Sequence, residues 1–199
     1  MNILITPDIL EWAIGNLTRG ITNAKCMKRF NFFTVPVHPR GTSEAYLPLE
    51  SAVKNGIDFW HAMYWHSAEN VINTLPMLKL GKVPKLLTHH NHYALDKRDW
   101  IENFQGLSIA TQWGFDRLKT KHDFVYKIPY GLDLDRYSFI QEYPPKENNV
   151  GYIGRVIPHK NLKIICEVSK ELGYKVIGSG YVEDKEYWRS FDHENLEYK

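Results

Sequence analysis

The stretch YIGRVIPHKNLKII, residues 152–165, decides the fold that we expect for this chain. Its first residues are the end of an apolar run, residues 150–154, that is typical of a buried strand. Its last residues are the start of an amphipathic helix that extends to Gly173. A second apolar run, residues 175–177, follows directly. The order of strand, helix and strand predicts a right-handed βαβ unit, whose first loop lies at the carboxyl end of a strand. Open α/β sheets bind their ligands at that end.

Two cations, Arg155 and Lys160, lie in this loop directly before the predicted helix. The planar guanidinium of Arg155 suits a bidentate contact with phosphate, and the amino group of Lys160 is a compact point charge. A helix that starts near Asn161 adds unpaired N–H groups and the positive end of its dipole. The loop therefore predicts a site for two adjacent phosphates, and a solvated loop with two incidental cations is the alternative. A P-loop is excluded because the second glycine and the Ser or Thr after the lysine are missing.

Short apolar runs alternate with helical patterns upstream of this unit. We predict strands at residues 2–6, 32–37, 57–65, 85–88, 107–110 and 125–128, and helices at residues 8–24, 67–80, 96–103 and 112–121. Pro36 predicts that its strand lies near an edge, and Asp8 with Glu11 resembles a capping box at the start of the first helix. The alternation predicts an α/β protein with a Rossmann-like, doubly wound parallel sheet.

The polar segment QEYPPKENN, residues 141–149, contains two prolines and has no periodicity, which predicts a linker. We therefore expect a first domain at residues 1–143 and the beginning of a second, incomplete Rossmann-like domain at residues 144–199. The final residues, 193–199 (HENLEYK), resemble the start of a further strand. Two or three strands leave an apolar edge and face uncovered, so we expect a homo-oligomer through this second segment.

The composition excludes several classes of protein. The chain has 199 residues, 43% of them hydrophobic, and a formal net charge of +2 without a long run of one sign, so nucleic acid is not expected as a partner. The N-terminus does not resemble a signal peptide, and no apolar run approaches the roughly 18 residues that a membrane span needs. Cys26 and Cys166 match no metal or redox spacing and are expected to be buried. We expect a cytoplasmic protein, and peripheral contact with a membrane stays open.

Four segments resemble, in order, motifs of the family 4 (group 1) glycosyltransferases of GT-B fold. Residues 154–161, GRVIPHKN, and the following YKVIGSG resemble the family's G-R-x-x-x-x-K-G at the start of its second domain. The other three segments are IPYGLDLDRYSF (128–139), LSIATQWGFDRLK (107–119) and LLTHHNH (86–92). Asn161 replaces the family's glycine after the lysine, which a capping backbone tolerates. The family's Glu-x7-Glu element lies further along than this sequence reaches, so we expect a fragment or an unusually short relative.

The resemblance implies roles for three polar residues. Arg155 and Lys160 would bind the diphosphate of a nucleoside diphosphate sugar and stabilise its charge as the glycosidic bond breaks, without a metal. His90 would correspond to the family's active-site histidine at the end of a first-domain strand. The alternative for His90 is a histidine that is merely hydrogen-bonded in a loop.

Three glycines complete the predicted donor site. Gly178 and Gly180 would let the backbone approach the donor, and a plain turn at the strand exit is the alternative. Gly15 would mark the place where the first domain comes close to the donor, because the family often has a glycine pair in that neighbourhood.

Other polar and aromatic groups have weaker interpretations. A metal site would need the four residues His89, His90, His92 and Asp96. Adjacent histidines on an extended segment point to opposite faces, so we expect no metal there. The D-x-D at residues 133–135 is interpreted as structural. Most of the aromatic cluster at residues 60–66 is expected in the core, with Trp65 and His66 as cleft residues.

The resemblance therefore implies an enzyme that moves a hexose-like unit from a nucleoside diphosphate sugar to an unknown acceptor with retention at the anomeric carbon. The acceptor would be a saccharide or a lipid-linked saccharide, and no cofactor is expected besides the donor substrate. Two alternatives stay open: a truncated relative that binds nucleotide or sugar without transfer, and another GT-B enzyme such as a nucleotide-sugar epimerase.

Overall fold

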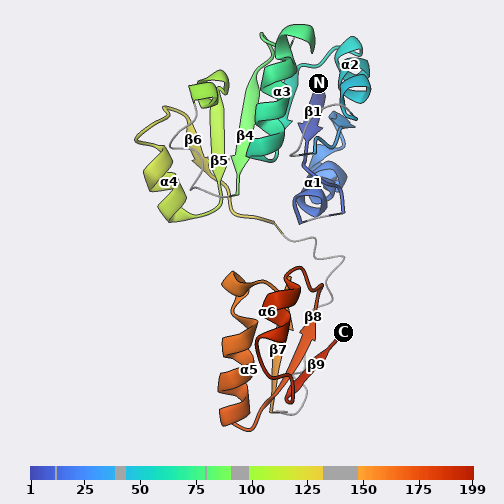
Figure 1. Cartoon of the computed structure of the whole chain (residues 1–199). Helices are drawn as coiled ribbons and strands as arrows, with labels where there is room; N and C mark the ends of the chain where they lie inside the picture. The colour runs from blue at the N-terminus through green and yellow to red at the C-terminus, as the bar shows by residue number, and fades with distance from the viewer. Residues whose placement is uncertain (12, 39–43, 79, 91–98, 132–147) are drawn as a thin grey trace. The chain divides into compact units, whose positions relative to one another are not determined.

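The computed structural model describes the chain except for residues 12, 39–43, 79, 91–98 and 132–147 (Figure 1). It divides into two compact units, Met1–Ser138 and Phe139–Lys199, which are described separately. The predicted boundary between residues 143 and 144 lies outside the described residues and stays a prediction.

The first unit is built on a six-stranded parallel sheet with the order β2-β1-β3-β4-β5-β6. Its strands are β1 (Asn2–Thr6), β2 (Asn31–Thr34), β3 (Phe59–Ala62), β4 (Lys85–His89), β5 (Gly106–Ile109) and β6 (Val125–Lys127). The strand order runs outward in both directions from β1, which confirms the doubly wound sheet. The edge position of β2 also confirms the prediction from Pro36.

Helices cover both faces of this sheet. They are α1 (Ala13–Asn23), α2 (Tyr46–Lys54), α3 (Trp65–Leu78) and α4 (Gln112–Leu118), with 3₁₀ helices η1 (Lys25–Met27) and η3 (Asp99–Asn103). Successive residues of β1 point to opposite faces: Ile3 and Ile5 pack with α1, whereas Leu4 belongs to the larger core that includes α2 and α3. The sheet is therefore the middle of three layers.

One prediction at a helix start is wrong, and one helix was not predicted. Helix α1 begins at Ala13, so Asp8 does not cap it, and Asp8 is instead buried with 4% of its surface exposed. Helix α2 was not predicted, because its N-cap, Ala45, makes no side-chain cap bond and Pro48 stands in its first turn. Proline is tolerated there because the first turn has no intrahelical N–H bonds to lose.

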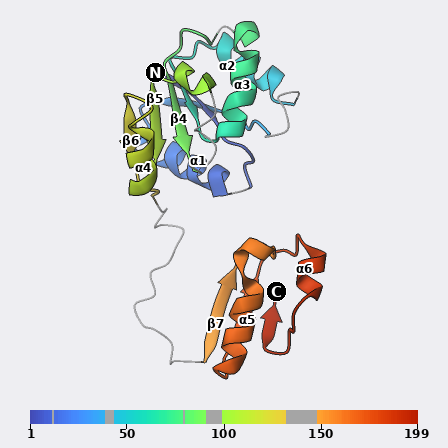
Figure 2. The same cartoon turned by 60° about the vertical axis from the view of Figure 1, so that its left-hand side comes forward.

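The second unit is a three-stranded parallel sheet with the order β7-β8-β9. Its elements are β7 (Asn149–Ile153), the 3₁₀ helix η4 (Pro158–Lys160), α5 (Leu162–Glu171), β8 (Lys175–Ser179), α6 (Lys185–Arg189) and β9 (Leu196–Tyr198). Helix α5 runs alongside β7 and ends before Gly173, whose φ of 71° is the left-handed conformation that stops helices (Figure 2). The predicted βαβ unit is confirmed.

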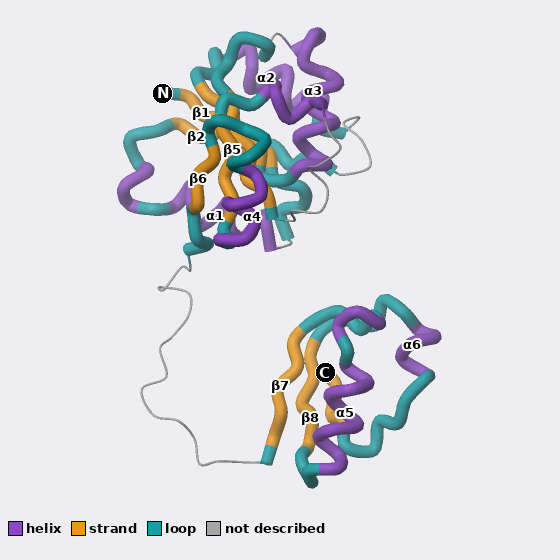
Figure 3. Tube along the Cα trace, turned by 90° about the vertical axis from the view of Figure 1, so that its left-hand side faces the viewer, coloured by secondary structure: helices purple, strands orange, loops and turns teal. Residues whose placement is uncertain are grey.

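Within the described residues of this unit, helices cover one face of the second sheet. Helices α5 and α6 lie on the same side of it (Figure 3), where Tyr152 and Val176 join their apolar residues in one core. The opposite face carries Ile153, which is 92% exposed, and Ile177, which is 38% exposed. The sheet thus presents apolar side chains to solvent, as the small number of strands predicts.

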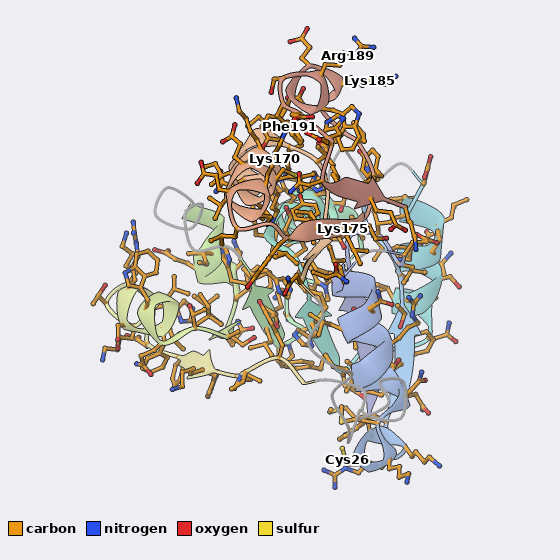
Figure 4. The ribbon with its side chains drawn as sticks, turned by 90° about the horizontal axis from the view of Figure 1, so that it is seen from below. Cys26, Lys170, Lys175, Lys185, Arg189 and Phe191 are labelled. Carbon is orange, nitrogen blue, oxygen red and sulfur yellow. The ribbon has the colours of Figure 1, made fainter. Side chains whose placement is uncertain are left out.

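The two cysteines differ in their surroundings. Cys166 is buried in the core of the second unit, as predicted, and burial raises the pKa of its thiol. The prediction for Cys26 is wrong: it lies exposed in η1, which follows α1 (Figure 4). The short 3₁₀ helix turns this side chain away from the sheet instead of extending the apolar face of α1.

None of the helices in the described parts of the chain combines the length and the apolar character that crossing a bilayer requires.

Candidate functional site

His90 stands at the carboxyl end of β4, where both of its ring nitrogens are hydrogen-bonded. Nε2 lies 2.7 Å from the carbonyl oxygen of Met63, and Nδ1 lies 2.6 Å from the hydroxyl of Tyr130. Because a carbonyl can only accept, Nε2 carries the hydrogen and Nδ1 accepts from Tyr130. Burial lowers the pKa of His90, which favours the neutral imidazole. Burial raises the pKa of Tyr130, which favours the protonated hydroxyl that donates to Nδ1. The ring is therefore held as one neutral tautomer.

Met63 ties His90 to the sheet. While its carbonyl accepts from His90, its N–H donates to the carbonyl of Thr6 at 3.0 Å. One residue thus joins the carboxyl ends of β1, β3 and β4. The indole N–H of Trp60 adds a bond to the hydroxyl of Thr6 at 2.9 Å. The ring of His90 is consequently tied through Met63 to the strands of the sheet.

A row of polar side chains crosses the same sheet. His61 Nε2 lies 2.7 Å from the hydroxyl oxygen of Thr88, which lies 2.7 Å from that of Ser108. Burial, with a smaller contribution from His90, lowers the pKa of His61 to about 4. His61 is therefore neutral near pH 7. We did not predict this row, although a polar residue inside each of three apolar runs was the available signal.

Asp8 lies two residues beyond β1 at this carboxyl edge. It is almost fully buried, and its Oδ1 has no hydrogen-bond partner among the described residues. Burial raises the pKa of Tyr64, and the nearby carboxyl group of Asp8 adds to this rise. At His90, burial lowers the pKa, and the hydrogen bond to Met63 and the nearby Asp8 oppose that change. A buried acceptor without a donor costs about 1–3 kcal/mol. Among the described residues, Nε2 of His89 is the other buried polar side-chain atom without a hydrogen-bond partner.

In the second unit, the predicted cations both lie in the loop between β7 and α5. Nη1 of Arg155 forms an ion pair with Oε2 of Glu183 at 2.8 Å, and both side chains are partly exposed. Lys160 is exposed at the end of η4, and its amino group has no ion pair within the described part of the chain. The loop thus holds one cation that is loosely paired and one that faces solvent.

The start of α5 differs in one respect from the prediction. Asn161 occupies the N-cap position with φ 56°, and its side chain makes no cap bond. The N–H of Lys163, however, donates to the hydroxyl of Tyr187 at 2.9 Å. This N–H is therefore not unpaired, because α6 delivers a tyrosine to it.

At each of the three glycines of the predicted donor site, close packing leaves no room for a side chain. A Cβ at Gly180, whose φ is 149°, would lie 2.1 Å from the carbonyl oxygen of Gly154, and one at Gly178 would lie 2.5 Å from the ring of Tyr198. A Cβ at Gly15 would lie 2.3 Å from the carbonyl oxygen of Leu10. Contact of these glycines with a ligand stays a prediction.

The remaining candidates are placed as follows. His89 is buried at the end of β4, whereas His92, Asp96 and residues 133–135 lie outside the described residues. No group of three or more potential metal ligands occurs in the described ranges. Trp65 is 7% exposed and stacks on His66 at the start of α3, so it is a core residue and not the cleft residue that we predicted.

Comparison with solved structures finds glycosyltransferases of GT-B fold. An α-glucosyltransferase in complex with UDP and a 13-mer DNA containing a central A:G mismatch superposes with a TM-score of 0.58 at 14% identity, over 94% of this chain and 58% of that one. The lipopolysaccharide outer core galactosyltransferase WaaB, in its apo form, superposes with a TM-score of 0.51 at 11% identity, over 100% and 67%. No family model and no curated protein matches the sequence.

These similarities establish the class of fold. The chain has a GT-B glycosyltransferase-like fold, as the four motifs predicted. It spans 58% of the length of the UDP-bound α-glucosyltransferase.

Proposed function

We propose that the protein is a glycosyltransferase that moves a sugar from a nucleoside diphosphate sugar to a hydroxyl acceptor. The observation that carries the proposal is the pair Arg155 and Lys160, placed after a parallel strand and before α5 in a βαβ unit of GT-B-like fold. The carboxyl ends of such strands are where α/β sheets bind nucleotides. The UDP in the neighbouring α-glucosyltransferase supports this class of donor.

In this proposal the two cations neutralise the diphosphate as it leaves, in place of a metal ion. The leaving group gains negative charge as the glycosidic bond breaks, and fixed cations stabilise that charge most in the transition state. The Arg155–Glu183 pair does not block the site, because partly exposed ion pairs contribute only about 0.2–1 kcal/mol. A diphosphate, with more charge than a carboxylate, would displace Glu183.

The first unit would bind the acceptor and place His90 beside the transferring sugar, with retention at the anomeric carbon. The neighbours do not share one acceptor: one is in complex with DNA, and the other is a lipopolysaccharide galactosyltransferase. A net charge of +2 without a basic run favours a saccharide or a lipid-linked saccharide over nucleic acid. A cytoplasmic location stays part of this proposal.

The second candidate is a protein that binds nucleotide or sugar without transfer. It is favoured by the extent of the similarity, since the chain spans only 58% of the α-glucosyltransferase. Incubation with nucleoside diphosphate sugars distinguishes the candidates: a transferase releases nucleoside diphosphate and forms a glycoside, and a binding protein does neither. A nucleotide-sugar epimerase would return an isomer of the donor.

Calorimetric titration with UDP and a panel of nucleoside diphosphate sugars tests the donor site. We predict that Arg155→Ala and Lys160→Ala each weaken diphosphate binding by about 1.5–3 kcal/mol, the range for hydrogen bonds to charged groups. Both side chains are exposed, so the melting temperature should stay nearly unchanged.

Lys185→Ala is the matched control, because Lys185 is an exposed lysine on α6 (Figure 4) outside the β7–α5 loop. It should bind as the parent does. If the parent, Arg155→Ala and Lys160→Ala bind diphosphate with equal affinity, the proposed diphosphate site in this loop is wrong.

A further inference from the structure

Asp8 is a buried carboxylate for which the surrounding fold supplies too few hydrogen-bond donors. It is 4% exposed, and its Oδ1 has no donor among the described residues. It lies at the carboxyl edge of β1, next to β3 in the sheet, where the strand order reverses. In doubly wound sheets this reversal is the position at which ligands bind.

Three hydrogen-bond donors around this edge are engaged with partners other than Asp8. His90 gives its Nε2 hydrogen to Met63, and the hydroxyl of Tyr130 donates to Nδ1 of His90. The indole of Trp60 donates to Thr6. None of these three bonds reaches Oδ1 of Asp8, which keeps unused accepting capacity. An ionised carboxylate only accepts hydrogen bonds, so its missing partner must be a donor.

We propose that Oδ1 of Asp8 accepts a hydrogen bond from a hydroxyl group of the saccharide or polyol acceptor and so orients it at the carboxyl edge of the first sheet. The inference rests on the proposed function and names the residue that recognises its acceptor. A hydroxyl hydrogen on a carboxylate makes a short, charge-assisted bond, which is the interaction that a sugar offers and an apolar ligand cannot. Asp8 is a positioning residue in this scheme, and His90 stays beside the transferring sugar.

The test compares the full chain with Asp8→Asn, which keeps the shape of the side chain but removes its charge. Saturation-transfer NMR with methyl α-glucoside, methyl α-galactoside and glycerol measures polyol binding, and thermal melting measures stability. We expect Asp8→Asn to bind at least about tenfold more weakly than the parent. Its melting temperature should be equal or higher, because the variant no longer buries an incompletely bonded charge. Asp116→Asn, at an exposed position on α4, is the control that should change neither measurement.

Three results would overturn the inference: unchanged polyol binding in Asp8→Asn, a lower melting temperature that marks Asp8 as structural, or no binding of any of the three probes by the parent. UDP titration of the same samples separates this test from the proposed function. UDP binding without dependence of polyol binding on Asp8 refutes only the role of Asp8. If polyol binding depends on Asp8 but the protein does not bind UDP, only the proposed transferase function is refuted.

Discussion

His90 illustrates how a single side chain is constrained at the edge of the first sheet. Its partners, Met63 and Tyr130, are 27 and 40 residues away in the sequence, yet they fix the ring in one tautomer. A ring held in one tautomer suits the role that we propose for His90 beside a transferring sugar.

We predict that His90→Ala lowers kcat by about 10²-fold or more, the effect of removing one preorganised polar group, and changes donor affinity much less. Release of nucleoside diphosphate measures kcat, and calorimetry measures donor affinity. His122→Gln is the control, because both ring nitrogens of His122 are hydrogen-bonded too, in its case to backbone groups, at the far end of the strands. Turnover equal to that of the parent in His90→Ala would return His90 to a structural role.

His61 makes stability depend on pH. Its pKa is about 4 in the folded protein against an ordinary value of 6.5, so between these values the unfolded chain binds the extra proton and the native state does not. The contribution is fully present above pH 6.5 and is lost as the pH falls toward 4. The loss amounts to at most about 3.5 kcal/mol, since one unit of pKa corresponds to about 1.4 kcal/mol.

We predict that His61→Gln flattens this dependence. Urea unfolding at several pH values between 4 and 6.5 measures the free energy of unfolding of the parent and of the variant. Subtracting one curve of free energy against pH from the other cancels the contribution of the carboxylates, which both proteins share. The two curves should converge as the pH falls. Parallel curves would mean that His61 does not titrate in this interval.

At the scale of elements, the contact between α1 and the preceding loop depends on one glycine. We predict that Gly15→Ala destabilises the protein by about 1–3 kcal/mol, the usual cost of overpacking, because the added Cβ would meet the backbone of Leu10 at 2.3 Å. Chemical denaturation measures the free energy of unfolding.

Gly20→Ala provides an internal control in the same helix, since a Cβ there meets nothing within 4 Å. Alanine is the better helix former, so this variant should gain about 0.5–1 kcal/mol. Two changes of the same sign and size would refute the close approach at Gly15.

The elements differ in how well the sequence predicts them. The strands were predicted because buried parallel strands consist of near-continuous apolar runs, and β4 ends at the T-x-H that located His90. Helix α2 was missed because Pro48 and the absence of a polar cap hide its start. Helix α6 has five residues, too few to show a period.

The sequence predicted candidate site residues only where they belong to a short, continuous motif. Arg155 and Lys160 belong to a motif within one loop. Asp8 was assigned to a cap because it stands three residues before Glu11, and only tertiary packing places it beside His90 and Tyr64. Sequence spacing cannot reveal a contact between residues more than 50 positions apart.

On the scale of the whole molecule, the face of the second sheet opposite α5 and α6, which carries the exposed Ile153 and Ile177, predicts self-association. We propose that a second copy covers Ile153 and Ile177 and buries at least roughly 1,000 Å². Sedimentation of the parent should show a dimer. Ile153→Thr keeps a β-branched residue in the strand and should weaken the dimer at least about tenfold, because a buried isoleucine contributes about 1.5–3 kcal/mol.

Ile164→Thr is the control, because Ile164 is 55% exposed on α5, on the helix side of the same unit. It should leave the dimer intact. A monodisperse monomer at all concentrations would refute self-association through this face.

The contrast between Cys26 and Cys166 provides a chemical probe of each unit. The thiolate is the reactive form of cysteine, so a maleimide should modify exposed Cys26 in the folded protein. Cys166 is sequestered in the second core, where burial also raises the pKa of its thiol, and should react only after that core opens. The first labelling event therefore attaches a dye to the first unit. The rate of the second reports how often the second unit opens, so one reagent and a mass spectrometer can follow the local unfolding of one unit while the other carries a fixed label.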